Sequence, residues 1–97
     1  MPIGVTDLSA GPERLRIRLR GAVQGVGFRP FVYSLAKRYG LSGFVLNDQD
    51  GVLAEIEGHG GDLFLAALRN ERPALARIDK IAVTRVAALG RQGFAIR

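Results

Sequence analysis

The stretch RLRIRLRGAVQGVGFRPFVYSLAKRYG, residues 14–40, contains a strand pattern, a glycine-rich loop and a helix pattern in direct succession. In its first part, arginine alternates with leucine and isoleucine, which is the period of a half-buried strand with its arginines on the outer face. In its last part, from about residue 30 to residue 39, apolar residues recur at helical spacing, and Gly40 is a typical C-cap. The stretch therefore predicts a strand that passes into a helix through the loop 21–30.

The rest of the chain predicts a hairpin of two strands, a second helix and two C-terminal strands, the last of them a short edge. Their predicted bounds, in chain order, are 44–47, 52–57, 63–69, 78–86 and 94–97. This order is typical of an α+β, ferredoxin-like βαββαβ sandwich, in which an antiparallel sheet carries both helices on one face. Right-handed crossovers would place the first and third strands at the sheet centre and bring the loop near the end of the second strand.

Length and composition indicate one small soluble domain. Hydrophobic residues make up 47% of the 97 residues and charged residues 24%, as in ordinary globular domains. The absence of cysteine excludes disulfides and thiolate metal sites, and we expect no metal and no cofactor. The net charge of +5 favours anionic partners, from small phosphates to nucleic acid.

The first thirteen residues lack the basic start and continuous apolar stretch of a signal peptide, and no later segment reaches the length of a membrane span. We therefore expect a flexible leader over residues 1–13 and a single domain over residues 14–97. A cytoplasmic location and no contact with membranes follow as expectations.

Two glycines suit the loop to binding an anion. Gly25 and Gly27 can adopt positive φ angles and let the backbone curl around a ligand with no Cβ in the way. Backbone N–H groups in such a loop can converge on one anion, as they do in nests and at helix N-termini. The candidate backbone donors are Gly25, Val26, Gly27, Phe28 and Arg29.

Side chains of the loop support the same prediction. Pro30 suits the first helical position, where its missing N–H does no harm. The planar guanidinium of Arg29 can grip two oxygens of a phosphate or carboxylate, and no carboxylate lies within five residues to compete for it. The amide of Gln24 either binds the ligand or only rigidifies the loop. A tetrahedral oxyanion is the ligand that fits this loop best.

Residues 21–29, GAVQGVGFR, and residues 41–52, LSGFVLNDQDGV, resemble the two-part signature of the acylphosphatase family. The likeness covers nearly all of residues 14–97 and implies the same ferredoxin-like fold. It also implies that Arg29 and the loop amides bind the phosphate of an acyl phosphate, and that Asn47 orients the attacking water. Hydrolysis would then need no covalent intermediate.

A narrower resemblance lies in FRPFVYSLA, residues 28–36, and PALARIDKI, residues 73–81. Both are similar to the N-terminal domain of HypF-type carbamoyltransferases, a family of hydrogenase-maturation proteins. This resemblance implies carbamoyl phosphate as the substrate and downstream domains of a longer chain as partners. Gly27 and Asp48 depart from many free-standing acylphosphatases, which carry a residue with a side chain and a small hydroxyl there, and we expect these departures to affect the rate.

Charged residues outside the loop predict structure rather than chemistry. Glu55 and Glu57 alternate on a later strand and can pair with the arginines across a solvated sheet face, where such pairs contribute little. Asp48 directly follows Asn47, so its side chain should point to the other side, and we assign it to the turn. His59 stands in a glycine-rich turn without a second histidine or cysteine nearby, which favours loop polarity over metal binding.

A rival interpretation is a non-catalytic anion- or RNA-binding module, because small basic domains with this element order often bind RNA. Such domains display aromatic side chains on their central strands. The strands predicted at the centre here instead display Arg16, Arg18, Glu55 and Glu57. We therefore expect no nucleic-acid partner.

Overall fold

The computed structural model describes residues 12–97, which form five strands and two helices. Most of the predicted leader thus lies outside the described residues, and Glu13 belongs to the first strand. Neither helix is long and apolar enough to cross a membrane. In chain order the elements are β1 (Glu13–Ala22), α2 (Phe28–Arg38), β2 (Ser42–Asp48), β3 (Gly51–Gly58), α3 (Gly61–Asn70), β4 (Arg77–Val86) and β5 (Phe94–Ile96).

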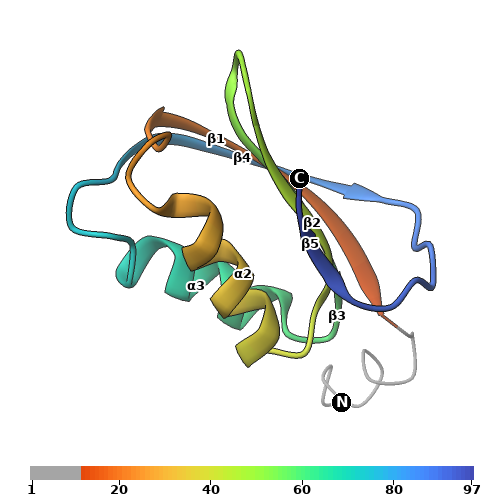
Figure 1. The fold of residues 1–97 in the computed structure, drawn as a ribbon. Helices are drawn as coiled ribbons and strands as arrows, with labels where there is room; N and C mark the ends of the chain where they lie inside the picture. Colours follow the sequence, from red (N-terminus) through yellow and green to blue (C-terminus); the bar gives the residue numbers. More distant parts are fainter. Residues whose placement is uncertain (1–11) are drawn as a thin grey trace, which may run out of the picture.

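The strands form one sheet in the order β4-β1-β3-β2-β5, and both helices cover one face of it (Figure 1). As predicted, β1 and β3 lie at the centre, and the four long strands pair in antiparallel fashion. The short strand β5 instead runs parallel to β2, so the complete sheet is mixed. The reason is that the segment 87–93 carries the chain across the end of the sheet to the far edge, and β5 therefore lies beside β2 instead of β4.

The core lies between the helices and the sheet. The alternation predicted for the first strand is confirmed, because Ile17 and Leu19 are fully buried on the helix side. On β2, Val45 is buried on the same side, as are Val52 and Ile56 of β3. The helical residues buried against them are Phe28, Val32, Leu35, Ala36, Phe64, Ala67 and Leu68.

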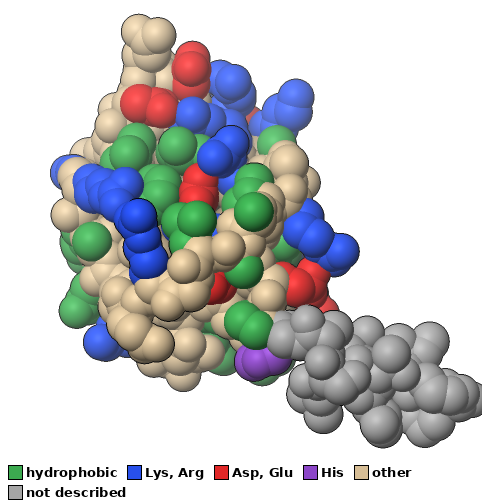
Figure 2. Space-filling model, turned by 90° about the vertical axis from the view of Figure 1, so that its right-hand side faces the viewer, with side chains coloured by type: hydrophobic (Ala, Val, Ile, Leu, Met, Phe, Trp, Pro, Cys, Tyr) green, Lys and Arg blue, Asp and Glu red, His purple; other side chains and the backbone are tan. Residues whose placement is uncertain are grey.

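The opposite sheet face carries the predicted cross-strand ion pairs, with Arg14 beside Glu57 and Arg16 beside Glu55 in the strand register. Arg14 Nε lies 2.7 Å from Glu55 Oε1, and Arg16 Nε lies 2.8 Å from Glu55 Oε2. Figure 2 shows this side of the molecule, where basic side chains surround apolar ones and acidic side chains lie among them.

The expectation that these pairs are solvated was wrong for three of the four residues, because Arg14, Glu55 and Glu57 are 5%, 7% and 5% exposed. This burial arises because the segment 87–93, which leads to β5, lies against the open sheet face at Glu57. The backbone N–H groups of Leu89 and Gly90 donate to the two oxygens of Glu57, at 2.8 and 2.9 Å. Glu57 therefore fastens this connection to the sheet.

The attachment of Glu57 predicts acid-sensitive stability. Hydrogen bonds from Leu89 and Gly90, with a further one from Arg14, hold the pKa of Glu57 below its ordinary range. Since the unfolded chain has the ordinary pKa of about 4.3, this stabilisation is present above that pH and is lost as the pH falls through the folded-state pKa. Glu57→Gln should lower the urea midpoint at pH 7 and flatten its decline on acidification.

The matched control is Glu13→Gln, which removes a carboxylate from an exposed pair with Arg85. That variant should follow the wild-type pH dependence closely, because exposed pairs contribute little. Urea unfolding at several pH values between 7 and 3 measures both effects. Parallel pH curves for the wild type and Glu57→Gln would contradict the assignment.

Candidate active site

The loop between β1 and α2 adopts the conformation predicted for its glycines. Gly25 and Gly27 have φ angles of 74° and 77°. Gly27 is the N-cap of α2, and no side chain caps this helix end. The helix begins at Phe28, so Pro30 is its third residue and not its first. Its missing N–H remains harmless there, because the first turn of a helix has no internal acceptors for its amides.

Backbone donors in this loop have no acceptor in the described protein. The first backbone hydrogen bond of the helix runs from Phe31 N to Gly27 O, at 3.2 Å. Within residues 12–97, the amides of residues 24–29 donate no hydrogen bond. The partly exposed guanidinium of Arg29 likewise has no ion-pair partner in this part of the chain. Unused donors therefore gather at the positive end of a helix, which suits an anion.

Asn47 lies near the end of β2, on the side of the sheet that faces the helices. It pairs with Val52 of β3, which in turn pairs with Leu19 near the end of β1. Its Oδ1 atom is buried and has no hydrogen-bond partner among the described residues. A buried acceptor without a partner is costly unless a water or ligand satisfies it. Asn47 can thus hold a water molecule at this strand end.

Gln24 joins the loop to the strand end that carries Asn47. Its Nε2 atom donates to the backbone oxygens of Asp48, at 2.6 Å, and Gly51, at 2.9 Å. These contacts support the predicted proximity of the loop and the end of the second strand. They favour the interpretation that the Gln24 side chain rigidifies the loop, because they engage both of its N–H groups. Only the backbone amide of Gln24 is left to contact an anion.

Asp48 has the predicted orientation, because its carboxylate lies on the open face and not beside Asn47. Both of its oxygens accept hydrogen bonds from Arg18, at 2.6 and 2.9 Å. These bonds hold the pKa of Asp48 below its ordinary range. Sequence reasoning missed this contact. The strand register places Arg18 opposite Leu53 and Leu53 opposite Leu46, two residues before Asp48, so the pair reaches diagonally across β3.

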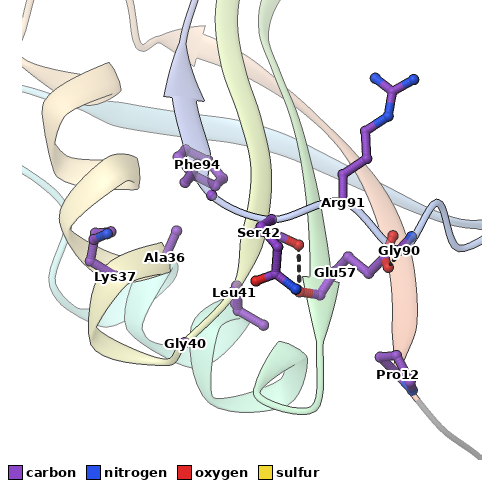
Figure 3. Close-up of a pocket in the computed structure, with 12 residues that line it drawn as sticks. Pro12, Ala36, Lys37, Gly40, Leu41, Ser42, Glu57, Gly90, Arg91 and Phe94 are labelled. Atoms are coloured by element: carbon purple, nitrogen blue, oxygen red, sulfur yellow. Dashed lines mark hydrogen bonds between the residues drawn. The ribbon is translucent and has the colours of Figure 1, made fainter.

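Other side chains near the loop lie outside this site. The Phe28 ring is 1% exposed and packs edge-on against Phe31, so the two rings belong to the core and its border, while the Phe28 amide stays among the unpaired donors. His59 is exposed, and residues 12–97 contain no cluster of three or more potential metal ligands. A pocket of about 390 Å³ lies at the opposite end of β2, between Lys37, Ser42 and the segment 90–94 (Figure 3). It contains neither Arg29 nor Asn47.

Fold and site together define a small α+β domain with a loop of unpaired backbone amides at the start of a helix, tied by Gln24 to the strand end that carries Asn47. The chain matches the profile of the acylphosphatase family over residues 15–96 and belongs to that family.

Among curated proteins, the chain is 58% identical over 84 residues to the carbamoyltransferase HypF of Rhizobium leguminosarum bv. viciae, a match that covers 87% of this chain and 11% of that protein. It is 41% identical over 88 residues to an acylphosphatase of a Synechococcus species, which covers 88% of this chain and 74% of that protein. The chain thus spans only a small part of the carbamoyltransferases that it matches.

The fold also matches the crystal structure of full-length HypF in its phosphate- and nucleotide-bound form. The TM-score is 0.84 at 38% identity, over 89% of this chain and 12% of that one.

Proposed function

We propose that this domain hydrolyses acyl phosphates to a carboxylate and inorganic phosphate at the loop 24–29 and Asn47. The observation that carries the proposal is the unpaired buried Oδ1 of Asn47 at a strand end that Gln24 ties to a loop of unpaired amides. One part of this arrangement suits a phosphate, and the other suits a water molecule.

In the proposed reaction, the loop amides and Arg29 bind the phosphate oxygens and stabilise the charge that develops on them. Asn47 Oδ1 accepts a hydrogen bond from the attacking water and holds it in line with phosphorus. The water oxygen bonds to phosphorus, the bond from phosphorus to the acyl oxygen breaks, and the carboxylate leaves. A phosphate oxygen of the substrate takes the proton of the water, so the step needs no general base and no covalent intermediate.

The substrate we propose is carbamoyl phosphate, and the setting is the N-terminal domain of a cytoplasmic carbamoyltransferase in hydrogenase maturation. Support comes from the 58% identity to the Rhizobium HypF and from the likeness to a HypF structure with bound phosphate. The domain would release carbamate for activation by downstream domains of a longer chain.

The test is hydrolysis of benzoyl phosphate, followed by ultraviolet absorbance, and of carbamoyl phosphate, followed by phosphate release, with enzyme-free controls. We expect turnover of both substrates and competitive inhibition by inorganic phosphate, because product and substrate share the loop. If the folded chain binds phosphate but hydrolyses neither substrate, the non-catalytic anion-binding interpretation replaces this one.

A further inference from the structure

Asp48 contacts three separate parts of the domain. Its carboxylate accepts two hydrogen bonds from Arg18 of β1, and its Oδ1 also accepts one from Asp50 N in the hairpin turn, at 2.9 Å. Its backbone oxygen accepts the Gln24 amide of the phosphate loop, at 2.6 Å. The residue therefore links the central sheet, the turn and the loop at the position directly after Asn47.

We propose that Arg18 and Asp48 form a positioning pair that fixes Asn47 relative to the phosphate loop, an inference that rests on the proposed function. The Asp48 carboxylate lies on the open sheet face and does not reach the substrate side, because successive strand residues point to opposite faces. It acts through the backbone that it shares with Asn47.

The geometry of the pair suits this role. The guanidinium of Arg18 presents Nη1 and Nη2 to the two carboxylate oxygens, a planar arrangement that resists rotation of either group. The side chains of Arg18 and Asp48 are 23% and 33% exposed, so the pair is partly shielded from water. Holding the Asp48 side chain limits the rotation of the peptide that carries Asn47 and of the carbonyl that Gln24 contacts.

A neighbouring pair provides a matched control. Arg20 of β1 and Asp50 of the hairpin turn each lie two residues beyond Arg18 and Asp48, but their closest ion-pair distance is 3.8 Å and both side chains are about half exposed. The Asp50 side chain has no hydrogen bond to the loop or to Asn47 in the described structure. Removal of the Asp50 charge therefore tests the effect of net charge on activity, because it leaves the contacts at the end of β2 in place.

The variants are Asp48→Asn, Arg18→Gln and their combination, with Asp50→Asn as the control. Asparagine keeps the volume of Asp48 and an oxygen for the Asp50 amide, but it weakens the bidentate pair. We expect kcat for benzoyl phosphate to fall about tenfold in each single variant, because a small displacement of a reacting group is costly. KM should change less than about twofold, and the double variant should resemble the single ones, because each removes the same contact.

A second readout does not depend on turnover. In ¹H–¹⁵N spectra without ligand, Asp48→Asn and Arg18→Gln should shift the side-chain amide of Asn47 and the backbone amides of residues 24–29, while Asp50→Asn leaves them in place. If the wild type proves inactive, the proposed function fails, and these spectra still decide the positioning role. Unchanged spectra, a kcat like that of the control, or unfolding of both variants would overturn the inference.

Discussion

Replacement of Arg29 by alanine is expected to lower kcat/KM for an acyl phosphate by about a thousandfold, the range seen when an arginine that stabilises phosphoryl transfer is removed. Arg29 is the second residue of α2, directly beside the unpaired loop amides. In the proposed reaction, its charge adds to theirs where the phosphate charge develops. The loss should appear in kcat and in KM, because in that reaction the guanidinium binds the phosphate both before and during the chemical step.

The control for this variant is Lys37→Ala, which removes one positive charge from the exposed C-terminal turn of the same helix. It should retain nearly full activity, since net charge alone acts weakly at physiological ionic strength. Arg29→Lys should recover only part of the loss, because an ammonium group lacks the planar fork. Circular dichroism confirms folding in each case. A folded Arg29→Ala protein with activity close to that of the control would refute the phosphate-binding role.

Replacement of Asn47 by alanine is expected to have the second large effect. Unlike the loss of Arg29, it should lower the rate of the chemical step and leave phosphate binding nearly unchanged. Removal of one donor or acceptor that acts on the transition state typically costs about a hundredfold in rate. Here we expect kcat to fall by about that factor. KM and inhibition by inorganic phosphate should stay close to wild type, since the loop amides and Arg29 are intact. Stability should be nearly unaffected or improve, because the buried Oδ1 has no partner in the described structure.

Ser42→Ala provides the matched control, because Ser42 is a half-buried polar residue at the other end of the same strand. Assays of benzoyl phosphate hydrolysis measure the rate of the chemical step. Phosphate titrations monitored by ¹H–¹⁵N spectra measure phosphate binding separately. If Asn47→Ala loses phosphate binding in proportion to its rate, the residue belongs to the phosphate cradle and does not position the water.

Much of the fold could be predicted because the signals are local. Alternation of arginine with Ile17 and Leu19 reports one buried strand face, and helical spacing after the loop reports α2. The parallel placement of β5 could not be predicted, because three residues carry little pattern and the direction depends on the path of the segment 87–93. The same path buries Glu57, which in sequence has the alternation of a solvated face.

The sequence by itself determined the conformation and the available donors of the loop 24–29, since Gly25, Gly27 and Arg29 lie within one short segment whose chemistry depends on near neighbours. Only the tertiary structure decided which acceptors Gln24 engages, that Arg18 holds Asp48, and that Oδ1 of Asn47 is buried without a partner. The two residues in each of these hydrogen bonds are separated by 24 to 30 positions in the sequence. They meet because the whole sheet sets the strand register and the burial.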